Sequence, residues 1–85
     1  NAISFLRPGT YTVRRDARFS YLSLLALDET VCGVSLCGLK YPLCNASLSR
    51  AIPIGISNEW VTDEAKISIG EGRALLIFSG DERDE

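Results

Sequence analysis

Hydrophobic and polar residues alternate in short runs along most of this chain, and residues typical of turns separate the runs. Short runs at intervals of about 8–12 residues are typical of β-sandwiches and β-barrels. No run has the length and the 3.6-residue period of an amphipathic helix. The sequence therefore predicts an all-β fold, an antiparallel β-sandwich of about seven or eight short strands. The runs that predict strands are 3–6, 11–14, 19–27, 31–36, 65–69 and 74–78.

Two turns in this pattern predict hairpins. Pro8-Gly9 lies between the first two runs, and Gly70-Glu71-Gly72 lies between the last two. Proline and glycine at such positions are strong turn signals. In the run 65–69 the apolar residues alternate with polar ones, so the side chains expected to point inward are Ala65, Ile67 and Ile69.

The run 19–27 is apolar on both of its faces. This pattern predicts a strand that is central in its sheet or buried at an interface. A helix is the competing interpretation, because Leu-Leu-Ala-Leu has good helix propensity, but the aromatic start and the short length favour a strand. In the run 31–36, Gly33 predicts a bulge or a close approach of two backbones.

The length and the charge of the chain restrict its class. Its 85 residues suit one domain with a thin core, and no segment has the roughly 18 consecutive apolar residues of a membrane span. The net charge is −2, and the nine basic residues are scattered except around Arg14, Arg15 and Arg18. A nucleic-acid surface usually clusters its basic residues, so we expect no nucleic acid partner and no membrane.

The chain has three cysteines, Cys32, Cys37 and Cys44, and no histidine. Without histidine, Ser-His-Asp and Cys-His catalysis are excluded within this chain. The cysteine spacing fits none of the usual zinc patterns, so no metal site is predicted. We expect free, buried cysteines that act as small hydrophobic residues in a reducing cytoplasm.

The regular alternation stops in the stretch 38–60, which contains the single tryptophan. Gly38 allows an unusual backbone conformation, and Pro42 holds Tyr41 extended, so that its ring can face a flat ligand or a cation. Ser57 and Asn58 offer a hydroxyl and an amide to a polar ring edge. The alternative interpretation is that Tyr41 is a half-buried packing residue and that Ser57-Asn58 and 45–47 are ordinary turns.

Three motifs in this stretch resemble the C-terminal domain of bacterial thiamine pyrophosphokinase. They are Gly-Leu-Lys-Tyr-Pro-Leu at 38–43, Asn-Ala-Ser-Leu-Ser at 45–49 and Ile-Gly-Ile-Ser-Asn-Glu at 54–59. The Ile-Ser-Phe-Leu opening, the Phe-Ser-Tyr-Leu-Ser-Leu-Leu strand and the Ile-Ser-Ile-Gly-Glu-Gly-Arg ending are similar to that family in order and spacing. The resemblance covers most of the chain.

The resemblance implies an activity and a domain organisation. Enzymes of this family transfer a diphosphate from ATP to thiamine, with magnesium, and release thiamine diphosphate and AMP. An N-terminal α/β domain carries the acidic metal site and ATP, and a C-terminal β-sandwich helps to bind thiamine between the subunits of a homodimer. We therefore expect residues 1–85 to be a C-terminal fragment of a longer cytoplasmic enzyme, with no catalytic residue and no activity of its own.

The resemblance also assigns the substrate-binding residues by position. Tyr41 takes the place of the aromatic residue that packs on thiamine, and Ser57 and Asn58 take the place of the polar pair at the pyrimidine ring. Gly38 and Leu39 take positions that line the approach. The chain departs from the family at Cys44-Asn45, where relatives often have Asn-Asn, and at Arg50-Ala51, where they often have Phe-Gly.

Two other functions are compatible with the pattern. The chain could be a structural dimerisation module without thiamine contact, which the doubly apolar run 19–27 suggests. It could also be an adhesion or carbohydrate-binding sandwich. Such modules usually gather several aromatic residues on one face, whereas this chain spreads them through its strands.

Overall fold

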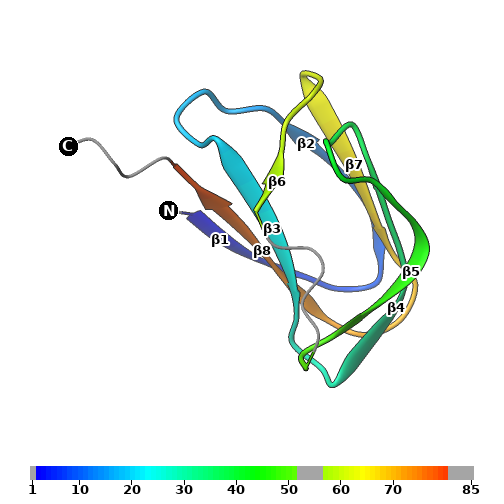
Figure 1. The fold of residues 1–85 in the computed structure, drawn as a ribbon. Coiled ribbons are helices and arrows are strands. Elements are labelled where there is room, and N and C mark those ends of the chain that lie inside the picture. The colour runs from blue at the N-terminus through cyan, green and yellow to red at the C-terminus, as the bar shows by residue number, and fades with distance from the viewer. Residues whose placement is uncertain (1, 52–56, 81–85) are drawn as a thin grey trace.

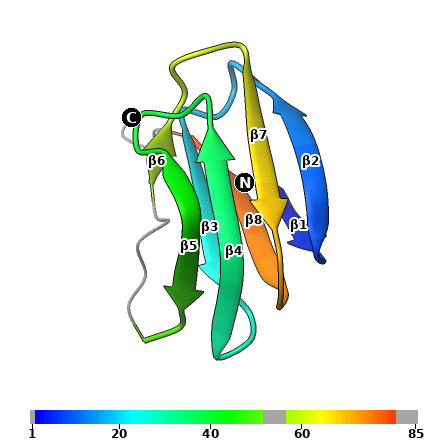
Figure 2. The same ribbon diagram turned by 90° about the vertical axis from the view of Figure 1, so that its right-hand side faces the viewer.

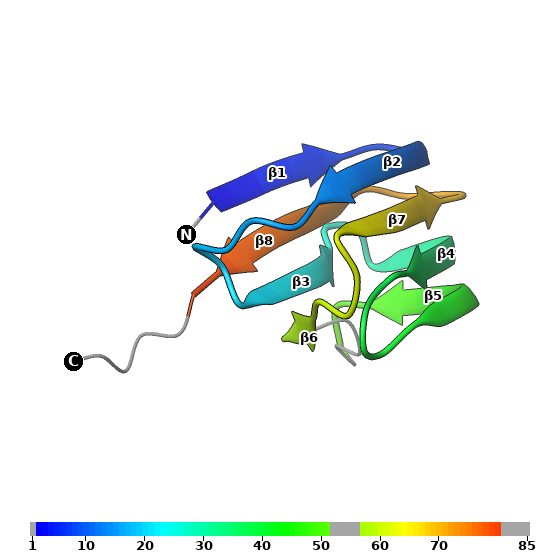
Figure 3. The same cartoon turned by 90° about the horizontal axis from the view of Figure 1, so that it is seen from above.

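The computed structural model describes residues 2–51 and 57–80, which form two antiparallel four-stranded sheets (Figure 1). The strand order is β1-β8-β3-β6 in the first sheet and β2-β7-β4-β5 in the second. Figure 3 shows the two sheets as facing layers, which confirms the predicted β-sandwich. The strands are β1 (Ala2–Leu6), β2 (Gly9–Arg14), β3 (Tyr21–Ala26), β4 (Thr30–Cys37), β5 (Leu43–Ser49), β6 (Asn58–Glu59), β7 (Glu64–Ile69) and β8 (Ala74–Ser79).

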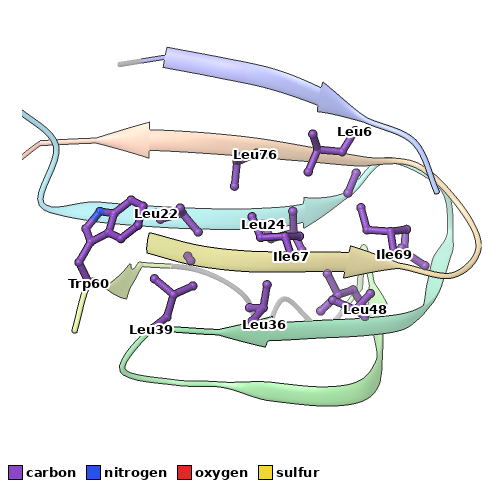
Figure 4. Packing of buried hydrophobic residues seen from close by; sticks show 14 residues of the cluster. Leu6, Leu22, Leu24, Leu36, Leu39, Leu48, Trp60, Ile67, Ile69 and Leu76 are labelled. Carbon is purple, nitrogen blue, oxygen red and sulfur yellow. The ribbon is translucent and has the colours of Figure 1, made fainter. Parts of the chain in front are cut away.

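The core fills the space between the two sheets with alternate residues of each strand (Figure 4). Leu22 and Leu24 enter it from β3, and Leu36 enters it from β4 on the opposite side. Each large side chain that is fully buried in this way stabilises the fold by about 1.5–3 kcal/mol. The inward orientation predicted for β7 is confirmed by its three buried residues, Ala65, Ile67 and Ile69. The described residues contain no helix long and apolar enough to cross a membrane.

The first predicted hairpin is wrong, because β1 and β2 lie in different sheets. β1 pairs with β8, and β2 pairs with β7. The Tyr11 hydroxyl accepts a hydrogen bond from the Arg7 N–H at 3.1 Å and donates one to the Arg7 carbonyl at 2.7 Å. These bonds hold the chain in a corner at Pro8, so the turn signal marks a crossing between sheets.

The second predicted hairpin is wrong for a similar reason. β7 belongs to the second sheet and β8 to the first, so the connection Gly70-Glu71-Gly72 crosses from one layer to the other. Its backbone bonds to β4 instead, since the Gly70 and Glu71 N–H groups both donate to the Cys32 carbonyl at 3.0 Å. Glycine signals a change of direction in both cases, but it does not say which strands then pair.

The run 19–27 forms a strand, as predicted, and the helical interpretation is wrong. The strand β3 is shorter than the run and lies between β8 and β6 in the first sheet. The bulge predicted at Gly33 is confirmed by a register shift between Val31 and Val34 and by a φ of 66° at Gly33.

The strand β5 was not predicted, because its sequence looked like a turn. Asn45-Ala46-Ser47 lies within this strand, opposite β4. Asn45 has a φ of 51°, and its N–H donates to the Ser35 hydroxyl at 3.0 Å. Asparagine tolerates this left-handed conformation, so it introduces an irregularity into the strand without ending it.

The cysteines are free, as predicted, but the prediction that they are buried is wrong. Cys32 is half-buried, whereas Cys37 and Cys44 are exposed. Cys37 lies opposite Lys66 on the outer face of the second sheet, where alternation turns its side chain away from the core.

Candidate functional site

The candidate site lies at one end of the sandwich, where the connections β2–β3, β4–β5 and β6–β7 come together (Figure 2). Residues 38–41 follow β4, and residues 57–62 contain β6. The two segments lie side by side, because Leu39 and Trp60 form a β-bridge and the Lys40 N–H donates to the Glu59 carbonyl at 2.8 Å. The fold thus brings together both segments that the sequence singled out.

The side chain of Asn58 joins these two segments. It is 2% exposed, its Oδ1 accepts the Tyr41 N–H at 2.8 Å, and its Nδ2 donates to the Tyr41 carbonyl at 2.8 Å. Its Oδ1 also accepts the Glu59 N–H at 3.0 Å. The buried amide of Asn58 therefore bonds both the N–H and the carbonyl of Tyr41, as the backbone of a neighbouring β-strand would.

These bonds use most of the hydrogen-bonding capacity of Asn58. An asparagine amide has two acceptor positions and two donor hydrogens, and three of these four bond the chain itself. Among residues 2–51 and 57–80, a single N–H of Asn58 has no partner. The contact of Asn58 with a pyrimidine ring stays a prediction, and the geometry gives this residue a positioning role through Tyr41.

Gly38 begins the turn that leads to Tyr41. Its φ is 84°, and a Cβ at this position would collide with the backbone carbonyl oxygen of Glu64. Its carbonyl accepts the Val61 N–H at 3.3 Å, so the glycine also ties the β4 end to the β6–β7 connection. Leu39 is 3% exposed and belongs to the core, so its contact with an approaching ligand stays a prediction.

The ring of Tyr41 projects from the clamped backbone and is the exposed aromatic group of this end. The residue is 55% exposed. The Lys40 ammonium lies 5.5 Å from the ring centroid and 4.0 Å from a Glu59 carboxylate oxygen. The electron-rich face of the ring therefore already attracts one cation in this structure.

Ser57 is held next to Asn58 in an unusual backbone conformation. Its φ is 57°, and its N–H donates to the hydroxyl of Ser23 at 2.8 Å. Ser57 is exposed, so its hydroxyl is available to a ligand. The Ile-Gly-Ile part of the same motif, residues 54–56, lies outside the described residues.

Sequence reasoning missed two features of this site. The first is the pair formed by Lys40 and Glu59, which become neighbours only when the two segments meet. The second is the Trp60 indole N–H, which is buried and has no hydrogen-bond partner among residues 2–51 and 57–80. In Figure 4 this nitrogen lies on the side of the indole that points away from the other labelled core residues. The presence of a single tryptophan in the sequence was the signal that could have pointed to this indole N–H.

The other groups that could form a site are less suitable. An open depression lined by Cys32, Gly33, Gly70 and Glu71 lies beside the β4 bulge, at the other ends of β4 and β7. The N–H groups of Gly70 and Glu71 are already bonded to the Cys32 carbonyl. In the described part of the chain, no three His, Cys, Asp or Glu side chains converge to hold a metal ion.

Fold and site together define an all-β domain that presents a fixed aromatic side chain at one end of a sandwich. A family model described as thiamin pyrophosphokinase, vitamin B1 binding domain, matches residues 10–74. The chain is 31% identical over 81 residues to the thiamine pyrophosphokinase of Bacillus subtilis strain 168, covering 95% of the chain and 38% of that protein. The chain belongs to the thiamin pyrophosphokinase vitamin B1 binding domain family.

Solved structures agree with this membership. The crystal structure of thiamine pyrophosphokinase from Bacillus subtilis matches with a TM-score of 0.89 and 30% identity over 93% of this chain and 37% of that one. The thiamin pyrophosphokinase from Geobacillus thermodenitrificans matches with a TM-score of 0.88 and 41% identity over 95% and 38%. The chain thus spans a little over a third of the length of these relatives.

Proposed function

We propose that this chain binds thiamine as part of a thiamin pyrophosphokinase, and that the full-length protein transfers a diphosphate from ATP to thiamine, giving thiamine diphosphate and AMP. The observation that carries the proposal is the exposed ring of Tyr41, held between two segments by the buried amide of Asn58. Family membership supports the same ligand.

The chemistry of thiamine suits this arrangement. Thiamine has a flat aminopyrimidine and a cationic thiazolium, and an aromatic face attracts both a flat ring and a cation. Lys40, which lies 5.5 Å from the ring centroid, can move toward Glu59 when a ligand cation takes its place. The exposed hydroxyl of Ser57 is a hydrogen-bonding group for the polar edge of the pyrimidine.

The contribution of this domain to the reaction is to hold and orient thiamine. Fixing one reactant removes its translational and rotational freedom before the reaction and so lowers the barrier. No group of metal-binding side chains converges among the described residues. We therefore propose that magnesium and ATP bind to another domain of the full-length protein. The chain alone is accordingly proposed to be inactive.

The setting of the protein is proposed to be cytoplasmic, and its assembly a homodimer. The three cysteines are unpaired, and two of them are exposed, which is typical of a reducing compartment. A homodimer agrees with the exposed Ile3 and Phe5 of β1, which lie beside Ile77 and Leu75 of β8. No nucleic acid partner is proposed.

The test is the affinity for thiamine of the chain and of its Tyr41→Ala variant, measured by calorimetry. If the contact with the ring contributes about 1–2 kcal/mol, Tyr41→Ala raises the Kd roughly tenfold or more. Tyr41→Phe is the matched control, because it keeps the aromatic face, and its Kd stays within about twofold of the wild type. Equal affinities for all three chains would remove Tyr41 from the site. A full-length protein that neither binds nor converts thiamine would refute the proposed function.

A further inference from the structure

The ammonium of Lys40 occupies a small cation site beside Tyr41. Its nitrogen lies 5.5 Å from the centroid of the Tyr41 ring and 4.0 Å from a carboxylate oxygen of Glu59. An aromatic face and a carboxylate both attract positive charge. The side chains of Lys40 and Glu59 are 51% and 44% exposed, so both can move without disturbing the core. The chain therefore fills with its own lysine a position that suits a ligand cation.

The backbone holds Lys40 and Glu59 together, whereas their side chains stay adjustable. The Lys40 N–H donates to the Glu59 carbonyl at 2.8 Å, next to the bridge between Leu39 and Trp60. A direct ion pair brings an ammonium nitrogen to about 2.7–2.9 Å from a carboxylate oxygen. The separation of 4.0 Å in this structure is longer, so the ammonium can approach the carboxylate further. Lys40 thus has two positions available, one over the Tyr41 ring and one closed onto Glu59.

A ligand cation on the Tyr41 ring and the ammonium of Lys40 exclude each other. Two positive charges a few ångströms apart repel at a protein surface, so the ring attracts a ligand cation in full only when Lys40 leaves it. Among the described residues, Glu59 carries the carboxylate that lies within 4.0 Å of this ammonium. The carboxylates of Glu64 and Asp16, at the same end of the sandwich, are already paired with arginines. Glu59 is therefore the group that can receive the displaced ammonium.

We propose that Glu59 is a specificity-determining residue that makes the site select a cationic ring over a neutral one. The proposal rests on the thiamine binding of the proposed function and names the group that sets its selectivity. When the thiazolium takes its place over the Tyr41 ring, the Lys40 ammonium closes onto the Glu59 carboxylate, so one carboxylate balances two neighbouring positive charges. A neutral ring of the same shape gains no such balance. The class of ligand that the site defines is accordingly a flat aromatic cation.

The two side chains act on thiamine binding in opposite directions. Glu59→Gln keeps the size and the backbone bonds of this residue, but it leaves the ammonium of Lys40 on the ring, where the ammonium competes with thiamine. Lys40→Met removes the competing ammonium. In the double variant K40M/E59Q there is neither a competitor nor a need for an acceptor. We therefore expect the second substitution to restore the thiamine affinity that the first one lowers.

Calorimetry on the full-length protein without ATP measures this selection with two ligands, thiamine and its neutral isostere, in which a thiophene ring replaces the thiazolium. We expect Glu59→Gln to raise the Kd of thiamine roughly three- to fivefold, as for a partly exposed ion pair, and to leave the Kd of the isostere within about twofold. The Kd of thiamine for K40M/E59Q returns to within about twofold of the wild type. The matched control is Glu71→Gln at the opposite end of the sandwich, which removes the same charge and changes neither Kd.

Three results would overturn the role of Glu59. The first is a Glu59→Gln protein that binds thiamine as tightly as the wild type, and the second is an equal rise of both Kd values, which a merely structural role would give. The third is a K40M/E59Q protein that binds thiamine as weakly as the Glu59→Gln protein, since Glu59 would then not act through Lys40. If Glu59→Gln is unfolded by circular dichroism, Glu59→Ala is measured in its place with the same expectation. A wild-type protein that binds neither ligand refutes the proposed function itself, so the two failures are distinguishable.

Discussion

The clamp that Asn58 forms on Tyr41 leads to a quantitative prediction. Asn58→Ala removes three hydrogen bonds: two at 2.8 Å that join the β4–β5 connection to β6, and one at 3.0 Å within β6. Each such bond contributes about 0.5–1.5 kcal/mol net, so the free energy of unfolding falls by about 3 kcal/mol. For a domain of this size, that loss lowers the Tm by roughly 10–20 °C.

Urea unfolding followed by the fluorescence of Trp60, the single tryptophan, measures this loss. Thiamine affinity should fall as well, by roughly tenfold. In the variant, binding must order the backbone of Tyr41, which the wild type already holds in place, and ordering one residue costs about 1–2 kcal/mol. Ser20→Ala, at an exposed serine, is the control and leaves both quantities unchanged. An Asn58→Ala chain within about 0.5 kcal/mol of the wild type would refute the clamp.

Two further predictions concern the glycine at the site and the acidic limit of stability. Gly38→Ala should lower the unfolding free energy by at least 2 kcal/mol in the same urea assay, because its Cβ would meet the Glu64 carbonyl; an unchanged midpoint would contradict this. Hydrogen bonds from Arg18 lower the pKa of Asp16 to about 2, and those from Arg73 lower the pKa of Asp28. Both carboxylates therefore stabilise the fold above about pH 4, the pKa range of unfolded aspartate, and lose this effect as the pH falls below that range. The urea midpoint of D16N/D28N should accordingly fall less between pH 5 and pH 2.5 than that of the wild type, and equal falls would contradict the assignment.

Most strands were predictable from the sequence, whereas β5 and the pairing of the strands were not. Alternation along 65–69 predicts the inward side of β7 because one face of a strand in a sandwich must be buried. The same local signal cannot distinguish a hairpin from a crossing between sheets. The connections at Pro8-Gly9 and at 70–72 have turn residues that suit both, and the choice depends on distant partners such as the Cys32 carbonyl.

The position of the candidate site was predictable in part. Gly38 and Tyr41 stood out because glycine and a residue before proline have restricted structural uses. The bonds from Asn58 to Tyr41 were not predictable, because the same side-chain amide can either contact a ligand at the surface or bond the backbone of another segment in the interior. Which of the two it forms depends on the bridge between Leu39 and Trp60, which joins residues far apart in the sequence.

The pairing of β1 with β8 has a consequence for how the domain folds. These are the first and the last strands, and Ala2 lies opposite Phe78, so nearly the whole chain forms a closed loop when they meet. The entropy lost on closing such a loop grows with its length, and contacts of this kind form slowly. Until β1 arrives, the hydrogen-bonding edge of β8 is open to other chains. The pairing of β1 with β8 therefore also protects this edge from pairing with other chains.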